Sequence, residues 1–444
     1  MADFTRAQKS SIDAAAWPAV AAVPMPRGGS VRTKLAEAAF ARACAKAGLA
    51  LEGESPDLTV ERAEVFQRVA ARGWTGLAEG YMAGEWSTTS SQVLVDDLVA
   101  LVGAGYRPVS PRPSAVPGGR RPVGAAGELP PDLTQHFAGS VASHAHGHFG
   151  TGVPTTERTR VKSHTPGAGR GNEPSHHFMD VTDIGAPLDA HRDDLTDAQL
   201  RSVAMLLEAA STNAGTHLLE MPCSGGAVVT QAVAKRITVD AVSFDERIAR
   251  GVEEQLILAG AEGSARVDLL SSTAEIPELA HQRRGVYDAV VSMNAFEALP
   301  AAEQTAYLQA AEEMLAPGGR VAVQTIVRTG AFSRAAGAAL TSLRPYSWPR
   351  LNVVTVDDID RLVDKHTGLR VTAVTTAPEH LAASLKLQRM TFDAHLRDAA
   401  ADGYDVVFRR MWTWQFALRE ALARLGMLDL AQVTMVQRHR RGRR

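Results

Sequence analysis

The C-terminal half of the chain alternates between two hydrophobic periods. Four short apolar runs have the composition of buried strands: THLLEM, ITVDAVSF, YDAVVSMN and RVAVQTIV, which begin at 216, 237, 287 and 320. Longer segments with apolar residues three and four positions apart predict amphipathic helices over 195–210, 225–236, 245–260 and 301–319. Regular alternation of strand and helix predicts a mostly parallel sheet covered on both faces. This is a doubly wound α/β domain, and its ligand is expected at the carboxyl ends of the strands.

The chain before this domain shows helical spacing. Apolar residues recur at helical intervals in 30–53, 58–73 and 90–105, and each segment ends at a glycine. We therefore expect a smaller, mainly helical N-terminal domain over 30–105. Residues 1–29 are rich in Ala, Pro and Gly and have no periodicity, so a flexible arm is expected there.

Proline and glycine dominate the next segment. Residues 106–174 contain runs such as RPVSPRPSAVPGGRRPVG, which no long periodic element tolerates, and this predicts a partly ordered linker. His136, His144, His146 and His148 lie within it. No cysteine or dense carboxylate set lies nearby, so a solvated loop is favoured over a metal site.

Length and composition narrow the function classes. A chain of 444 residues exceeds what one hydrophobic core usually organises, so a second domain is expected over 175–437, followed by a basic tail at 438–444. The 47 basic and 49 acidic residues nearly cancel, which argues against a nucleic-acid partner. Cys44 and Cys223 support neither a disulfide framework nor a zinc cluster. With no signal sequence and no apolar run long enough to span a bilayer, we expect a cytoplasmic protein.

A glycine-containing turn follows the first strand of the α/β domain. The stretch LLEMPCSGGAV, at 218–228, passes from an apolar strand to Gly225 and Gly226 before the next helix. In a doubly wound sheet this turn lets a nucleotide approach the backbone, and glycine removes the Cβ that would block it. The stretch therefore predicts a nucleotide-binding turn.

The order of these elements resembles S-adenosylmethionine-dependent methyltransferases with a seven-stranded, Rossmann-like sheet. Four stretches are more specifically similar to the cyclopropane-fatty-acyl-phospholipid synthase family, which includes mycolic acid cyclopropane synthases. They are GLAEGYMAGEW at 76–86, VSMNAFEALP at 291–300, GGRVAVQTI at 318–326 and the final segment from DGYDVVFRRMWTW to TMVQR at 402–438. The resemblance implies a methyltransferase-like domain and an N-terminal domain that is similar to a lipid-binding module.

The resemblance also implies a chemistry and a site. In the family, the methyl group of S-adenosylmethionine is delivered to a double bond in an acyl chain of a membrane phospholipid, and a base, often bicarbonate, removes a proton to close the ring. The residues expected to bind the cofactor are Glu220, Pro222, Ser224, Gly225, Gly226, Ser243 and Asp245. Glu297 matches the family's active-site glutamate, and Gln324 stands where the family has a bicarbonate-holding histidine.

Several positions depart from the family pattern. Pro222 replaces the first glycine of the turn with a residue whose φ is fixed and negative, and Ser224 adds a side chain where the cofactor would lie close. Gln324 is an amide that cannot accept a proton at neutral pH. Leu381 replaces a tyrosine, and a cysteine of the family has no counterpart. These changes predict weakened cofactor binding.

Two functions remain open on these grounds. The first is a divergent methyltransferase that acts on unsaturated acyl chains of phospholipids, since methylation without ring closure would not need the bicarbonate ligands. The second is a catalytically inactive pseudoenzyme that serves as a lipid-binding or regulatory partner, as a homo-oligomer or with a paralogue. Glu297 could equally be a strand-end or capping carboxylate without chemistry.

The basic tail RHRRGRR has two interpretations of its own. It is either a disordered, soluble tail or a cationic anchor for anionic phospholipid headgroups. In the second case each basic residue near the surface contributes about 1 kcal/mol, and the protein would lie at the inner face of the membrane.

Overall fold

The computed structural model describes residues 12–25, 29–109, 129–138, 146–171, 173–223 and 225–438. The chain forms two compact units. Unit 1 comprises Met1–Ala125, Gly330–Pro349 and Leu385–Leu428. Unit 2 comprises Ala126–Thr329, Arg350–Ser384 and Asp429–Arg444.

Unit 1 is mainly helical. Its helices are α2 (Pro18–Ala21), α3 (Gly29–Ala47), α4 (Glu64–Arg72), α5 (Trp74–Met82), α6 (Ser91–Gly103), α13 (Arg334–Leu340), η3 (Thr341–Leu343), α16 (Leu396–Ala401) and α17 (Val406–Arg424). Helix α15 (Pro378–Ala394) begins in unit 2 and ends in unit 1. The short strands β1 (Thr59–Val60) and β2 (Trp86–Ser87) pair antiparallel.

We expected a contiguous N-terminal domain over 30–105. The structure corrects this expectation, because two later segments of the chain also belong to unit 1. Helix α17 is the larger addition, and it packs against α5 and α6. Its Trp414 meets Trp86 edge to face, with ring centroids 6.0 Å apart, and contacts Tyr81 at 5.9 Å. Helical periodicity marks the apolar face of each helix but not its partner, so the sequence could not reveal this exchange.

The flexible arm expected over 1–29 is also corrected within its described part, 12–25. Trp17 is buried at 4% exposure, and its indole Nε1 donates a hydrogen bond to Asp405 Oδ2 at 2.7 Å. Its ring lies 6.2 Å from that of Tyr346. A single anchored tryptophan orders this segment because it buries a large apolar area and satisfies its donor.

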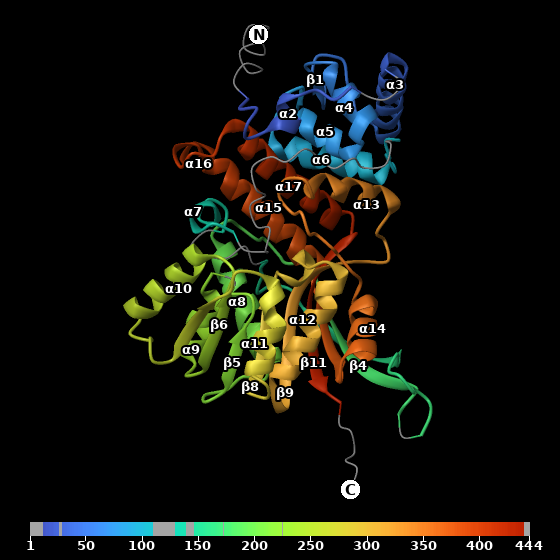
Figure 1. Ribbon diagram of the computed structural model, residues 1–444. Helices are drawn as coiled ribbons and strands as arrows, with labels where there is room; N and C mark the ends of the chain where they lie inside the picture. The colour runs from blue at the N-terminus through green and yellow to red at the C-terminus, as the bar shows by residue number, and fades with distance from the viewer. Residues whose placement is uncertain are drawn as a thin grey trace. The chain divides into compact units, whose positions relative to one another are not determined.

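Unit 2 is built on a nine-stranded sheet with the order β3-β4-β10-β11-β9-β8-β5-β6-β7 (Figure 1). The strands are β3 (Pro154–Lys162), β4 (His176–Ile184), β5 (His217–Glu220), β6 (Thr238–Ser243), β7 (Ala265–Leu269), β8 (Tyr287–Met293), β9 (Leu315–Arg328), β10 (Leu369–Thr376) and β11 (Leu428–Gln437). Strands β5 to β9 pair in parallel, and β11 is antiparallel to β10. The expected doubly wound α/β fold is therefore present.

The sheet has two strands more than the seven that were expected. The antiparallel hairpin β3–β4 is added beside β10, and β4 pairs with β10 in parallel. Strand β3 lies within 106–174, so the linker expected there is corrected: part of it is sheet. Nearly every residue of β3 is exposed, which explains why its sequence lacks the apolar alternation of a strand.

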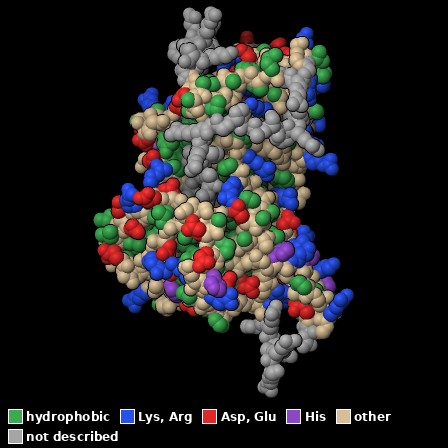
Figure 2. Space-filling model, viewed as in Figure 1, with side chains coloured by type: hydrophobic (Ala, Val, Ile, Leu, Met, Phe, Trp, Pro, Cys, Tyr) green, Lys and Arg blue, Asp and Glu red, His purple; other side chains and the backbone are tan. Residues whose placement is uncertain are grey.

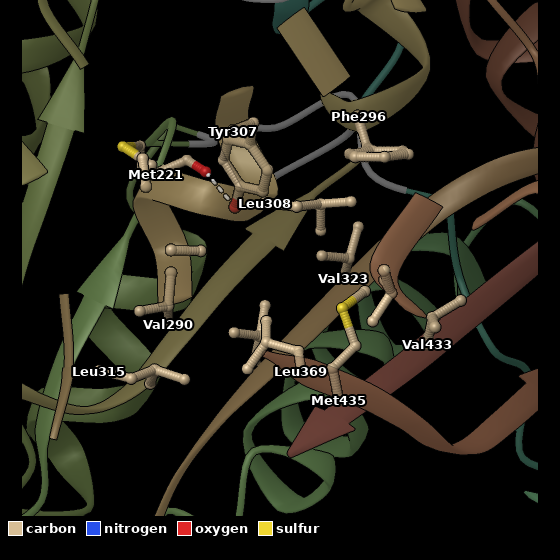
Figure 3. Packing of buried hydrophobic residues seen from close by; sticks show 14 of the residues in the cluster. Met221, Val290, Phe296, Tyr307, Leu308, Leu315, Val323, Leu369, Val433 and Met435 are labelled. Carbon is tan, nitrogen blue, oxygen red and sulfur yellow. Dashed lines mark hydrogen bonds between the residues drawn. The ribbon is translucent and has the colours of Figure 1, made fainter. Parts of the chain in front are cut away.

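Helices cover both faces of the sheet. They are α7 (Pro131–Thr134), α8 (Asp194–Ala209), α9 (Ala227–Ala234), α10 (Glu246–Leu258), η1 (Thr273–Glu275), α11 (Ile276–Gln282), η2 (Phe296–Ala298), α12 (Ala301–Met314) and α14 (Val356–His366). On β5, Leu218 joins a core cluster with α8, α9 and α10, whereas Leu219 joins the cluster with α11, α12 and α14. Figure 3 shows part of the second cluster, including Tyr307 and Leu308 of α12. The two-residue period of a strand thus divides the core into two layers.

Charge is evenly distributed on the surface seen in Figure 2. Acidic and basic side chains are interspersed there, without a continuous field of one sign. This agrees with the formal net charge of -2.

Candidate active site

The carboxyl ends of β6, β5, β8 and β9 meet at one edge of the sheet. The chain leaves β5 first toward β6 and β7, and later builds β8 and β9 on its other side. Such a reversal of strand order opens a crevice at the carboxyl ends of the strands. Glu220 is the last residue of β5, Ser243 is the last residue of β6, and Gln324 on β9 pairs with Met293, which ends β8. The expected residues therefore share this edge.

The turn after β5 is held by its neighbours. The Met221 amide donates to a carbonyl of β8 at 3.0 Å, and the Cys223 amide donates to a carbonyl of β6 at 2.6 Å. The Tyr307 hydroxyl on α12 donates to the Met221 carbonyl at 3.0 Å (Figure 3). The Met221–Pro222 peptide bond is cis. Ser224, expected to contact the cofactor, lies outside the described residues.

Both glycines of the turn have backbone angles that other residues rarely adopt. The φ values are +98° at Gly225 and +97° at Gly226, in the left-handed region. A Cβ on Gly226 would lie 2.8 Å from Gln255 Oε1 on α10. The turn therefore keeps backbone angles that favour glycine at 225 and 226 although Pro222 stands at its start.

The end of β6 is organised by local hydrogen bonds. The Ser243 hydroxyl donates to the Asp245 carbonyl at 2.9 Å and accepts from the Asp245 amide at 3.1 Å. Asp245 Oδ1 caps α10 by accepting from the Arg247 amide at 2.8 Å. Within the described part of the chain, Asp245 Oδ2 makes no hydrogen bond, and the side chain is 31% exposed. This oxygen is therefore available to accept a hydrogen bond from a ligand.

These features fit the cofactor that the family resemblance implies. Glu220 is fully buried at the end of β5, beside a turn whose two glycines leave the backbone uncovered by Cβ atoms. A carboxylate and a bare backbone at a topological switch point are what a nucleoside ligand requires. Glu220 and Asp245 would accept hydrogen bonds from the cofactor, and Gly225 and Gly226 would allow its close approach.

Glu297 is held against the neighbouring strand. It is 3% exposed and lies in η2, directly after the end of β8. Its Oε2 accepts a hydrogen bond from the Thr325 hydroxyl on β9 at 2.7 Å, and its backbone carbonyl accepts from the Asn352 amide at 2.7 Å. Helix α12 (Ala301–Met314) follows with Pro300 as its N-cap residue and has no side-chain cap, so Glu297 does not cap it.

Gln324 uses both ends of its amide in a buried network. Its Nε2 donates to Asn294 Oδ1 at 2.8 Å and to the His146 carbonyl at 3.2 Å. Its Oε1 accepts from Gln432 Nε2 on β11 at 2.8 Å. The side chain is fully buried. Gln324 therefore holds the site together and offers no base where the family has a histidine.

The histidine segment, expected to be a solvated loop, is buried at His136 and over 146–149, whereas His144 lies outside the described residues. The Ser202 hydroxyl on α8 donates to the His146 carbonyl at 2.8 Å, and His148 Nδ1 lies 2.5 Å from the same hydroxyl. Burial, together with nearby His380 and Arg201, lowers the pKa of His148 to about 3, so the ring is neutral at physiological pH. The signal that sequence reasoning missed was the glycine between these histidines: a Cβ on Gly147 would lie 2.5 Å from the Ala198 side chain.

Helix α15 fixes the other side of this segment. His380 Nδ1 accepts from the Phe149 amide at 2.8 Å, and His380 Nε2 donates to the Gly185 carbonyl at 2.9 Å. Burial lowers the pKa of His380, which agrees with a neutral ring. Leu381, where the family has tyrosine, is fully buried. It supplies packing without a hydroxyl.

Metal-binding and membrane-spanning features are absent from the described residues. No group of three His, Cys, Asp or Glu side chains in that part of the chain is arranged to hold a metal ion. No described helix combines the length and the apolar composition that crossing a bilayer requires.

The comparisons with known proteins agree with the geometry. The family model described as mycolic acid cyclopropane synthetase matches residues 184–433. Tuberculostearic acid methyltransferase UfaA1 of Mycobacterium tuberculosis is 26% identical, and the match covers 98% of each chain. Cyclopropane mycolic acid synthase 3 of the same species is 25% identical over 58% of this chain and 91% of its own. The solved structure of the cyclopropane synthase MmaA2 from Mycobacterium tuberculosis has a TM-score of 0.56 at 18% identity, and it covers 71% of this chain and 97% of that one.

The solved structure supports the fold, and the family match rests on sequence. The matched residues include β5, the glycine turn, Glu297 and Gln324, and they make up more than half of the chain. The resemblance found in the sequence is thereby confirmed. This chain belongs to the mycolic acid cyclopropane synthetase family.

Proposed function

We propose that this protein is an S-adenosylmethionine-dependent C-methyltransferase that acts on unsaturated acyl chains of membrane phospholipids. The observation that carries the proposal is the turn after β5, where Gly225 and Gly226 keep φ values of +98° and +97° beside the buried Glu220. A pseudoenzyme under no requirement to bind cofactor would have no reason to keep both glycines in this conformation.

The product we propose is a methylated chain without a cyclopropane ring. Gln324 cannot accept a proton, and both ends of its amide are already hydrogen bonded. The relative that spans 98% of this chain is named a methyltransferase, whereas the relative named a cyclopropane synthase matches 58% of it. Both points favour methyl transfer without the ring-closing step.

Each residue of the candidate active site would have its own role in the reaction. When bound, S-adenosylmethionine would supply an electrophilic methyl group to one carbon of the double bond and leave as S-adenosylhomocysteine. The cation formed on the chain would then lose a proton to the Glu297 carboxylate and become a ring-free, methylated alkene. Glu220 and Asp245 orient the nucleoside. Glu297, fixed by the Thr325 hydroxyl at 2.7 Å, places a negative charge beside the cation that develops on the acyl chain. Burial of this carboxylate strengthens the interaction because little water screens it.

A pseudoenzyme that binds lipid or regulates a partner is the second candidate. Pro222 at the start of the turn and the apolar Leu381 favour it, since both differ from the family pattern. Direct titration separates the two candidates. We expect the full chain to bind S-adenosylmethionine in the micromolar range by calorimetry, and Glu220→Gln to weaken binding while Glu208→Gln, an exposed position on α8, leaves it unchanged.

Product analysis completes the test. Vesicles of unsaturated phospholipid incubated with the protein and methyl-labelled cofactor should yield labelled, ring-free acyl chains. No binding at millimolar cofactor would exclude the enzyme and leave the lipid-binding partner. Cyclopropane products would contradict the assignment given to Gln324.

We also propose that the protein is cytoplasmic and associates peripherally with the membrane. The basic tail is the candidate anchor, and only Arg438 of it lies within the described residues. Its backbone amide donates to the Gly368 carbonyl at 2.8 Å, and its guanidinium is hydrogen bonded to Thr165 and Thr367. The anchor would therefore be 439–444, and truncation after Arg438 should reduce vesicle binding without lowering cofactor affinity.

A further inference from the structure

Unit 1 contains a cavity of about 290 Å³ that lies outside the candidate active site. Its lining includes Tyr81 from α5, Ser90 and Ser91 at the start of α6, and Arg409 and Arg410 from α17. At ~30 Å³ for each water in the liquid, this volume would hold several waters or one phosphate group with its substituent. Hydroxyls and guanidinium groups dominate its polar lining.

Arg409 and Arg410 line this cavity, and Arg62 lies near enough to repel Arg410. Within the described part of the chain, none of the three has an acidic partner. Among the described residues, Arg410 makes no hydrogen bond or ion pair. Arg62 donates from Nη2 to the Ala83 carbonyl at 2.8 Å, while its Nε and Nη1 are buried without a partner. Arg409 donates to two backbone carbonyls, those of Leu396 at 2.9 Å and Asp405 at 3.4 Å. Buried guanidinium groups normally pair with carboxylates, so this cluster lacks its counter-charge.

Electrostatics within the cluster agree with this geometry. Burial lowers the pKa of Arg410, and repulsion from Arg62 and Arg409 adds to the effect. Burial raises the pKa of Tyr81 to about 12, so its hydroxyl is neutral and can donate. A bound anion would relieve the repulsion and use these donors.

One acidic side chain also lines the cavity, but it is already engaged. Asp393 accepts a hydrogen bond from Ser91 and lies 3.6 Å from Arg389 Nη1. Arg389 is also paired with Glu420, because its Nε donates a hydrogen bond to the Glu420 carboxylate at 2.8 Å. Arg389 also donates to Ser91, so Asp393, Ser91, Arg389 and Glu420 form one polar network. Among the described residues, Asp393 makes no ion pair with Arg410.

The turn after α5 makes room for the guanidinium. Gly84 has a φ of +66°, and a Cβ there would lie 2.4 Å from Arg410 Nη1. Gly84 belongs to the stretch GLAEGYMAGEW, which marks the family resemblance and has no part in the active site. Glycine at this position lets Arg410 reach the cavity wall.

We propose that this cavity binds a phosphate group, with Arg410 as the principal ligand and the hydroxyls of Tyr81 and Ser90 beside it. A guanidinium binds phosphate through two parallel hydrogen bonds, which a single ammonium cannot do. The phosphate can come from inorganic phosphate or from a phospholipid headgroup. In the second case the inference rests on the proposed function, because the ligand is then of the lipid class on which the enzyme would act.

Calorimetric titration of the full chain tests the site. The two probes are inorganic phosphate and dihexanoyl phosphatidylglycerol, used below its micellar concentration. We expect both to bind and Arg410→Gln to weaken each by about tenfold or more. Arg397→Gln removes the same charge from an exposed position on α16 and should have no effect. Arg410→Lys should restore only part of the affinity, because the planar fork is lost.

The possible outcomes distinguish a phospholipid headgroup from free phosphate as the ligand of the cavity, and they keep this inference apart from the proposed function. Tighter binding of the lipid than of phosphate identifies a headgroup site, and binding of phosphate alone identifies a site for the free ion. Absence of binding for both probes, or equal binding by the wild type and Arg410→Gln, overturns the inference. S-adenosylmethionine affinity measured on the same samples reports on the proposed function independently, and an unchanged value in Arg410→Gln shows that the variant is folded.

Discussion

The side-chain amide of Gln324 donates a hydrogen bond to Asn294 Oδ1 at 2.8 Å, which joins the end of β8 to β9 at the centre of the candidate active site. Asn294 has a φ of +55°, a conformation that asparagine tolerates better than most residues. A side chain that sequence comparison marks as the loss of a catalytic histidine is therefore a structural member of a buried network. Such networks are costly to break because a polar atom left without a partner cannot turn to water.

Replacing Gln324 with alanine should destabilise the protein. The change removes a partner from Asn294 Oδ1 and from Gln432 Nε2, and we expect a loss of about 2–4 kcal/mol in the free energy of unfolding. Gln309→Ala, at an exposed position on α12, is the control and should cost less than about 0.5 kcal/mol. Urea unfolding followed by circular dichroism measures both. Equal losses for the two variants would contradict the network.

Gly226→Ala should lower both stability and cofactor affinity. The added Cβ meets Gln255 Oε1 at 2.8 Å in a backbone conformation with φ of +97°. We expect a stability loss of about 1–3 kcal/mol and at least about tenfold weaker cofactor binding. The matched control is Gly215→Ala, which has a φ of +87° and nothing within 4 Å of the new Cβ. If both variants bind S-adenosylmethionine as the wild type does, the turn after β5 is not the cofactor site.

Glu297→Gln should separate catalysis from binding. The amide keeps the size of the side chain and the hydrogen bond from Thr325, which is 2.7 Å in the wild type, but it removes the negative charge. If Glu297 stabilises a developing cation, methyl transfer should fall by about 100-fold or more while cofactor affinity stays the same. The rate of label transfer to unsaturated phospholipid and calorimetry report the two quantities. A rate within a few-fold of the wild type would leave Glu297 as a purely structural carboxylate.

The stability of unit 1 should depend on pH through Asp97 on α6. Burial, with Asp57 and Asp96 nearby, raises its pKa from 3.8 to about 7, and its Oδ2 makes no hydrogen bond within the described part of the chain. Between these pH values the folded state retains a proton that the unfolded state has released. The free energy of unfolding should therefore decrease as pH rises through this window, by up to about 1.4 kcal/mol per pH unit.

The isosteric variant Asp97→Asn tests this assignment. It should remove the pH dependence between about 4 and 7 and make the protein more stable than the wild type at pH 8. Asp398→Asn on α16 is the control, because Asp398 is exposed and is not among the charges that raise the pKa of Asp97. A wild-type profile that is flat across the window would mean that Asp97 titrates at its ordinary pKa.

Local sequence was enough to predict the parallel core of unit 2. Strands β5, β6, β8 and β9 contain short apolar runs, which are typical of buried strands. The helices between them have apolar residues at a period of 3.6 residues. Gly225 and Gly226 were identified for the same reason, since their function depends on their own backbone angles. The family resemblance located Glu297 and Gln324.

Other features depended on contacts between distant segments. Strand β3 is exposed over nearly all of its length and is a strand only because β4 pairs with it. His146 and His148 lie in a polar, glycine-containing stretch that resembles a loop, and they are buried because Ser202 and Ala198 on α8 complete their hydrogen bonds. The sequence of these segments has no hydrophobic period from which their structure could have been predicted.

By itself, then, the sequence determined the α/β core, the position of the glycine turn and the family, because hydrophobic period and glycine conformation act within a few residues. Only the tertiary structure decided that α17 belongs with α5 and α6 and that Gln324 is hydrogen bonded at both ends of its amide. It also decided that Arg410 lines a cavity and has no acidic partner within the described part of the chain. Each of these depends on which surfaces meet. The free energy of burial and of hydrogen bonding selects those partners among segments far apart in the chain, where no local pattern records the choice.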